Sequence, residues 1–223
     1  GLPVRLANAG YKVVAAPAHA LYFDMAQSSD PTEPGHDWAR ILPLDAVWAF
    51  DPLANGPTIP PLSDSGRANL LGIEATLFAE TVREPWRIDH MLMPRLLAMA
   101  ERGWSRAPDW LNSGDPARSD AMKAADWAAF VARLGYKTLP YVDARFPSLA
   151  YRLPAPGIMR DADRVSANYA WPGVTLRYSL SGKPPNAASP IMNGPITAPG
   201  PVTVAAFTTN GRASPPVTIE AMK

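Results

Sequence analysis

The 223-residue sequence contains no cysteine, which excludes disulfide bonds and thiolate metal sites. It also lacks an excess of charge of either sign, since 21 lysines and arginines face 20 aspartates and glutamates, a formal net charge of +1. Binding to nucleic acid or to an anionic membrane is therefore not expected, because both depend on clustered positive charge. No run of about 18 apolar residues occurs, so no transmembrane segment is predicted.

The composition that is present is globular, with 47% hydrophobic and 18% charged residues. In the first half, apolar runs predict strands at 11–16 and 69–78, and the spacing of apolar side chains predicts helices at 43–50 and 85–104. Turn-forming residues predict a long loop from Met25 to Arg40 and a Pro/Gly-rich passage up to Arg67. Strands that alternate with helices indicate an α/β fold.

The second half begins with a further predicted helix over 117–134, with Gly135 as its stop. After Tyr151 the pattern changes to alternating stretches at 174–180, 202–208 and 217–220, which is typical of a small β-sandwich. We therefore expect three parts: residues 1–107, a linking helix region at 108–150, and residues 151–223. Two strands and three helices do not close an α/β fold, so the first part is expected to belong to a larger domain.

Three motifs in the first half resemble the family 20 glycoside hydrolases. Residues 14–25 (VAAPAHALYFDM), followed by Trp38, resemble the seventh-strand region of that family's (β/α)8 barrel, and residues 72–82 (GIEATLFAETV) resemble its eighth strand. Residues 93–104 resemble the helix that follows. The stretches 151–157 and 172–178 resemble the immunoglobulin-like C-terminal module of the chitobiase branch. The resemblance implies the last quarter of a TIM barrel followed by a small immunoglobulin-like β-sandwich.

The resemblance also implies a function, that of a β-N-acetylhexosaminidase that removes terminal N-acetylglucosamine or N-acetylgalactosamine. In the family, the 2-acetamido oxygen of the substrate attacks the anomeric carbon with retention of configuration. The implied partner is an oligosaccharide or glycoconjugate that contains N-acetylhexosamine; no cofactor is implied. The implied location is periplasmic, outer-membrane-associated or secreted. The family's acid and orienting aspartate are an adjacent Asp-Glu pair, which this sequence lacks, so we expect the chain alone to be inactive.

Five residues match the family's sugar pocket. Tyr22 matches the tyrosine that bonds the acetamido oxygen, and a neutral phenol is suited to stabilise a developing charge. Asp24 and Glu80 match carboxylates that accept hydrogen bonds from sugar hydroxyls. Trp38 matches an aromatic residue at the pocket mouth, and Phe78 stands where the family has tryptophan, without the indole N–H. The alternatives are a packing tyrosine, a loop-capping aspartate and a glutamate in the first turn of a helix.

The remaining side chains carry no predicted chemistry. The three histidines (His19, His36 and His90) lack the spacing of a metal site, and no metal is predicted. Met91, Leu92, Leu96, Met99 and Trp104 are expected on the inner face of the last barrel helix, and Arg83, Arg87, Arg95, Arg102 and Arg106 in solvent or in ion pairs.

Two further hypotheses stay open. Tyr169, Trp171, Tyr178 and Phe207 invite a carbohydrate-binding hypothesis, but the sandwich core is the expected place for them. The competing function for the whole chain is a non-catalytic carbohydrate-binding or interaction module. Self-association is a third expectation, because an open part of a barrel exposes strand edges.

Overall fold

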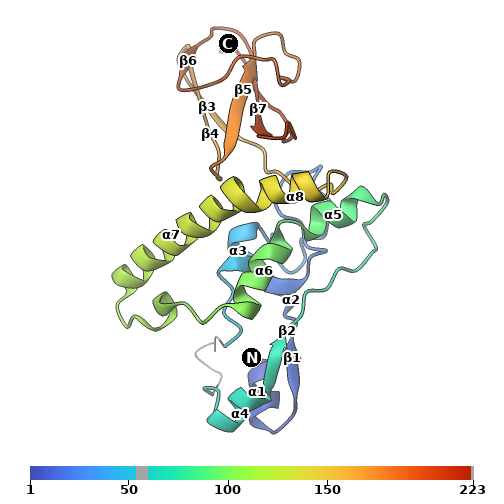
Figure 1. The fold of residues 1–223 in the computed structure, drawn as a ribbon, viewed down its shortest axis with the longest axis vertical. Helices are drawn as coiled ribbons and strands as arrows, with labels where there is room; N and C mark the ends of the chain where they lie inside the picture. Colours follow the sequence, from blue (N-terminus) through green and yellow to red (C-terminus); the bar gives the residue numbers. More distant parts are fainter. Residues whose placement is uncertain (54–59, 222–223) are drawn as a thin grey trace. The chain divides into compact units, whose positions relative to one another are not determined.

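A computed structural model of the chain describes residues 1–53 and 60–221 (Figure 1). The chain divides into two compact units, Gly1–Leu111 and Asn112–Lys223. Each unit is described by itself below. The predicted domain boundaries after residues 107 and 150 stay predictions.

The first unit contains a pair of parallel strands from distant parts of the sequence. Strand β1 (Val13–Ala15) pairs with β2 (Leu70–Ile73), within the two segments that the apolar runs predict. Helices α1 (Leu2–Asn8) and α4 (Asp64–Asn69) pack together beside the pair (Figure 1). Asn8 joins the two helices, because its side-chain oxygen accepts a hydrogen bond from the N-cap residue of α4 at 2.9 Å. Strands β1 and β2 therefore begin side by side, each after one of the two packed helices.

Helix α4 lies where a Pro/Gly-rich passage was predicted. Ser63 is its N-cap, and the Ser63 hydroxyl accepts the N–H of Gly66 at 3.0 Å, which satisfies one free donor of the first turn. The prediction for this passage was wrong over 64–67, and its residues 54–59 lie outside the described part of the chain.

The helix predicted over 85–104 is two helices, α5 (Trp86–Leu92) and α6 (Arg95–Trp104). The break falls at Pro94, which has no N–H to donate to the preceding turn and which restricts the residue before it. Met93 is accordingly extended, with φ −106° and ψ 134°. The apolar spacing alone did not show this break.

Helix α6 packs on α3 (Leu44–Trp48), which lies within the helix predicted at 43–50. Ala98 of α6 is fully buried. Leu96 and Trp104, both expected on the inner face, are instead 41% and 91% exposed, so the predicted apolar stripe is wrong at both ends of α6. A short helix, α2 (Ala18–Leu21), follows β1.

The second unit begins with a helical segment longer than the prediction. Helix α7 (Pro116–Arg133) is capped by Asp115, whose carboxylate accepts a hydrogen bond from the first turn at 3.0 Å. Gly135 does not stop it: a π-helical turn (Leu134–Thr138) leads directly into α8 (Leu139–Arg145). Gly135 lies against the backbone of Pro172, and a Cβ there would overlap the Pro172 carbonyl oxygen. A close approach, not helix termination, explains the glycine.

Two antiparallel sheets of three strands each complete the second unit, in the orders β3-β4-β6 and β5-β7-β8 (Figure 1). Val165 of one sheet and Val202 and Val204 of the other lie in one apolar core with Met192. Trp171 and Phe207 are buried, as expected for core residues. The strands are β3 (Gly157–Asp161), β4 (Arg164–Asn168), β5 (Val174–Ser179), β6 (Ile196–Thr197), β7 (Val202–Thr208) and β8 (Val217–Ile219).

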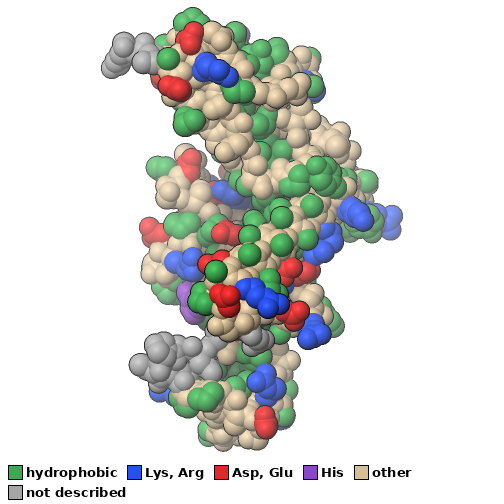
Figure 2. Space-filling view, turned by 90° about the vertical axis from the view of Figure 1, so that its left-hand side faces the viewer, with side chains coloured by type: hydrophobic (Ala, Val, Ile, Leu, Met, Phe, Trp, Pro, Cys, Tyr) green, Lys and Arg blue, Asp and Glu red, His purple; other side chains and the backbone are tan. Residues whose placement is uncertain are grey.

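The surface is mixed in charge. Basic and acidic side chains are interspersed on the face drawn in Figure 2, in agreement with the balanced composition. Within the described residues, no helix is long and apolar enough to cross a membrane.

Candidate functional site at the ends of the parallel strands

The parallel pairing of the first unit continues beyond β1 and β2. Thr76 donates its N–H to the carbonyl of Leu21 at 3.0 Å, and the Thr76 carbonyl accepts the N–H of Phe23 at 2.7 Å. Tyr22 and Thr76 form a parallel bridge. The segment 22–24 therefore lies at the carboxyl ends of two neighbouring parallel strands, where barrel and open α/β enzymes place their sites.

Three of the five predicted site residues meet in an aromatic cluster. The Tyr22 ring lies edge-on to the Phe78 ring, with centroids 5.3 Å apart and planes at 60°, and to the Trp38 ring, at 6.2 Å and 80°. Trp38 is 65% exposed and Phe78 46% exposed, although both are large and apolar. The three residues come from separate segments, so their rings form an apolar surface open to solvent.

Asp24 lies beside this cluster in the sequence but is almost fully buried, with 2% exposure. Its Oδ1 atom is shielded from solvent and has no hydrogen-bond partner among the described residues. A buried polar oxygen without a donor costs free energy, which indicates that a donor outside the described residues completes it. Glu80 is exposed on the turn just after Phe78, and no described contact joins it to the cluster.

The loop that carries Trp38 is closed at its base by backbone hydrogen bonds. His36 donates its N–H to the Asp24 carbonyl at 2.8 Å, and its carbonyl accepts the N–H of Ala26 at 2.7 Å. Gly35, with φ +126°, lies against these backbone atoms, and a Cβ there would come within 2.7 Å of them. These contacts therefore hold the base of the predicted irregular loop in a defined conformation.

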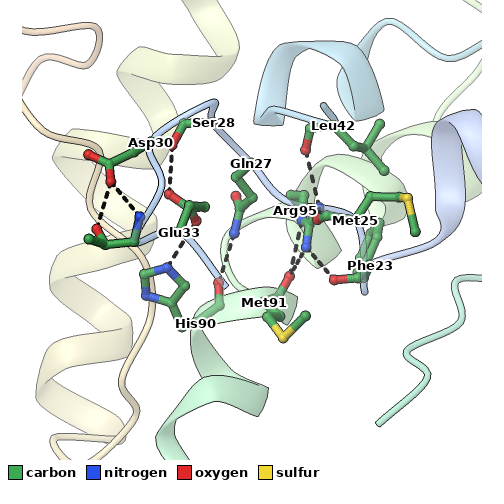
Figure 3. A network of polar contacts seen from close by, with 11 residues as sticks. Phe23, Met25, Gln27, Ser28, Asp30, Glu33, Leu42, His90, Met91 and Arg95 are labelled. Carbon is green, nitrogen blue, oxygen red and sulfur yellow. Dashed lines mark hydrogen bonds and ion pairs between the residues drawn. The ribbon is translucent and has the colours of Figure 1, made fainter. Parts of the chain in front are cut away.

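Side chains of the same loop bind α5 (Figure 3). Glu33 accepts from the Ser28 hydroxyl at 2.9 Å and pairs with the His90 ring at 3.1 Å, and the Gln27 amide donates to the His90 carbonyl at 2.8 Å. No role for His90 was predicted, because its partner lies 57 residues away in the sequence. These contacts hold the loop against the helix.

Arg95, expected in solvent or in an ion pair, is fully buried in the structure. It begins α6 and lies between the buried residues Met91 and Ala98 at helical spacing. That spacing is the signal in the sequence that marks Arg95 as inward-facing. Arg95 was predicted to be exposed because its side chain is charged. This prediction was wrong, because its helical spacing places it on the buried face.

The chemistry of the site follows from these groups. The site offers a phenol donor, a carboxylate oxygen without a described donor and an exposed aromatic surface. This combination suits a neutral ligand that has an apolar face and hydroxyls. Among the described residues, no group of three or more side chains from His, Cys, Asp and Glu is placed to hold a metal ion.

Comparison with known proteins gives the family. Residues 3–107 match the family model described as "Glycosyl hydrolase family 20, catalytic domain". Residues 3–107 belong to the family 20 glycosyl hydrolase catalytic domain. Residues 143–215 match the "Chitobiase/beta-hexosaminidase C-terminal domain", so both halves of the sequence resemblance are confirmed.

Relatives of known name agree with this membership. The chain is 32% identical to a beta-hexosaminidase of Vibrio vulnificus over 208 residues, which covers 79% of this chain and 24% of the relative. It is 30% identical to N,N'-diacetylchitobiase of Vibrio harveyi over 202 residues, 78% of this chain and 22% of the relative. The chain therefore spans about a quarter of the length of these family 20 enzymes.

Solved structures give the same family. The family 20 beta-N-acetylhexosaminidase of Streptomyces coelicolor has a TM-score of 0.51 at 28% identity, over 68% of this chain and 26% of that structure. A mutant Streptomyces plicatus beta-hexosaminidase, in complex with the product GlcNAc, has a TM-score of 0.51 at 28% identity, over 68% of this chain and 25% of that structure.

Proposed function

We propose that the protein containing this chain is a β-N-acetylhexosaminidase, and that residues 22–24 form part of its sugar pocket. The observation that carries the proposal is the aromatic cluster of Tyr22, Trp38 and Phe78 next to the buried, incompletely bonded carboxylate of Asp24. The substrate is a terminal N-acetylglucosamine or N-acetylgalactosamine residue. Family membership supports this class of substrate.

Tyr22 has the central role in catalysis. As the 2-acetamido oxygen attacks the anomeric carbon, the glycosidic bond breaks, its oxygen takes the proton of the acid, and positive charge develops on the acetamide. The Tyr22 phenol donates a hydrogen bond to the acetamido oxygen and holds it in line for the attack. The edge-on contacts with Trp38 and Phe78 hold the Tyr22 ring on two sides, so the donor is fixed before the substrate arrives.

Asp24 binds the sugar at its hydroxyls. Its Oδ1, which lacks a described donor, accepts a hydrogen bond from a sugar hydroxyl, and the bond is strong because the acceptor is charged and shielded from water. Glu80, exposed on the turn after Phe78, is the second carboxylate for the same sugar. Trp38 covers the apolar face of the pyranose, and Phe78 provides the opposite apolar wall without the hydrogen-bond donor of a tryptophan.

We also propose the architecture around this half-site. Residues 1–107 are the last quarter of a (β/α)8 barrel, and residues 151–223 are an immunoglobulin-like sandwich whose two sheets share the core around Val165. The chain has no adjacent Asp-Glu pair, so it carries the sugar-holding half of the pocket without the acid and the orienting aspartate. The 223 residues alone are inactive.

The test compares two substrates in two proteins. In its natural full length, the protein is expected to hydrolyse 4-nitrophenyl N-acetyl-β-glucosaminide but not 4-nitrophenyl β-glucoside, because only the former has the acetamido nucleophile. The isolated chain is expected to hydrolyse neither. Turnover by the isolated chain contradicts its proposed inactivity. Binding of N-acetylglucosamine by the full-length protein without any turnover favours the competing non-catalytic module.

A further inference from the structure

The largest fully buried side chain of the described residues is a cation. Arg95 has no solvent-exposed surface and stands at the first position of α6. A guanidinium is costly to remove from water, and a position that only needs packing is served better by an apolar side chain. The presence of an arginine at this buried position therefore indicates that its hydrogen bonds have a structural or functional role.

Those hydrogen bonds converge on backbone carbonyls from separate segments (Figure 3). Nη1 donates to Met25 at 2.8 Å and to Leu42 at 3.1 Å, and Nη2 donates to Phe23 and to Met91, both at 2.5 Å. Nε also donates to Met91, at 3.0 Å. All five N–H groups of the guanidinium are thus used, and they connect the strand end, the start of α3 and the end of α5.

Two of these carbonyls flank the proposed sugar-binding aspartate. Phe23 and Met25 are fully buried, and their carbonyls lie on the two sides of Asp24 in the sequence. The guanidinium also lies over the Phe23 ring, 4.8 Å from its centroid. Arg95 therefore holds the peptide group that leads into Asp24, through the Phe23 carbonyl, and the peptide group that follows Met25.

Different donors hold the successive carbonyls of this segment. The Asp24 carbonyl accepts the N–H of His36, and the Ala26 carbonyl accepts the N–H of Leu42 at 2.8 Å. The described hydrogen bonds to the Phe23 and Met25 carbonyls come from Arg95. A lysine carries its three N–H groups on one nitrogen and cannot replace a planar fork that reaches four carbonyls.

We propose that Arg95 is a positioning residue for the sugar-binding strand end, acting through Asp24. This inference rests on the proposed function of Asp24. Arg95 touches no substrate; it holds the backbone that aims the carboxylate. A displacement of about 1 Å in such a group lowers catalytic efficiency by up to about 100-fold.

The first test uses a ratio that the folded fraction of the enzyme does not affect. For the full-length protein, kcat/KM is measured for 4-nitrophenyl N-acetyl-β-glucosaminide and for the galactosaminide, which differ in the direction of one hydroxyl. Loss of folded enzyme lowers both values equally, whereas a misplaced Asp24 changes their ratio. Arg95→Lys is expected to change the ratio by about tenfold, the effect of one hydrogen bond to a charged group. In an Asp24→Asn background the same substitution is expected to change it little.

The matched control is Arg102→Lys. Arg102 lies on the same helix, and its guanidinium lies over the Trp48 ring at 5.3 Å, away from residues 23–25. An unchanged ratio in both variants overturns the proposal while the proposed function stands. A wild-type protein without turnover overturns the proposed function instead.

A second measurement decides the positioning role without activity. Amide hydrogen exchange is compared between wild type, Arg95→Lys and Arg95→Gln, which keeps two donors without the charge. The amides of Phe23, Met25 and Ala26 are expected to exchange about tenfold faster in the variants, with the β5-β7-β8 sheet unchanged. Unchanged exchange at these three amides, or equally faster exchange throughout the first unit, overturns the proposal.

Discussion

Replacement by phenylalanine is expected to have opposite effects on stability at two tyrosines of the second unit, Tyr151 and Tyr169. The Tyr151 hydroxyl donates to the Asp143 carboxylate at 3.0 Å, in a site where Asp143 also accepts from Arg212 at 3.1 Å. The Tyr169 hydroxyl is also shielded from solvent, but it has no hydrogen-bond partner among the described residues. Replacement by phenylalanine removes a strong hydrogen bond in one case and an unsatisfied hydroxyl in the other.

The magnitudes follow from these contacts. Tyr151→Phe is expected to lower the free energy of unfolding by about 2 kcal/mol, since a hydrogen bond to a charged group contributes about 1.5–3 kcal/mol. Tyr169→Phe is expected to raise it by about 1 kcal/mol, because the desolvation cost of a hydroxyl without a partner disappears. For a domain of about 100 residues, the difference of about 3 kcal/mol between the two variants corresponds to about 12–24 °C in Tm.

The assay is a thermal melt of the whole chain, followed by near-ultraviolet circular dichroism for each variant and for wild type. Wild type is expected to melt between the two variants. If Tyr169→Phe destabilises the chain as much as Tyr151→Phe, the Tyr169 hydroxyl has a partner and the assignment of these two environments is wrong.

Three other outcomes are expected. Burial raises the pKa of both phenols, with Asp143 adding to the effect at Tyr151, so the folded state keeps protons that the unfolded chain loses near pH 10. Stability should therefore fall as the pH rises above about 10, and less steeply in the double phenylalanine variant when the two are compared by urea unfolding. Gly135→Ala should destabilise by about 1–3 kcal/mol, because its Cβ overlaps a backbone oxygen, whereas Gly194→Ala, with open space around it, should not. The isolated chain should self-associate through its exposed strand pair, and Leu71→Lys, at a position 63% exposed, should shift it toward monomer in size-exclusion chromatography, unlike the control Leu180→Lys.

Local patterns in the sequence were sufficient for much of the fold. The alternating stretches at 174–180 and 202–208 correspond to β5 and β7, and the capped helix at 117–134 corresponds to α7 within one residue at each end. Gly135 was misinterpreted because a glycine at the end of a helix normally marks its stop, whereas here it permits contact with a backbone 37 residues further along the chain.

Residues of the candidate site could be proposed from the sequence, but the contacts that hold them in place could not. Motifs at the two strand ends were sufficient to name Tyr22, Trp38 and Phe78, which the structure brings together. Helical spacing marks Arg95 as inward-facing, but nothing local indicated that it binds the carbonyls of Phe23 and Met25, or that His90 binds the Trp38 loop. Both depend on contacts between residues more than 50 positions apart, which spacing along one segment cannot show.

The central claim is that Tyr22 stabilises the acetamido oxygen in the transition state. The most direct test measures kcat and KM of the full-length protein for 4-nitrophenyl N-acetyl-β-glucosaminide in Tyr22→Phe, with Tyr11→Phe as the control at an exposed tyrosine. The account predicts that Tyr22→Phe lowers kcat by about 100-fold, the cost of misaligning an attacking group, and that Tyr11→Phe changes neither constant. A Tyr22→Phe variant with wild-type kcat would contradict the account.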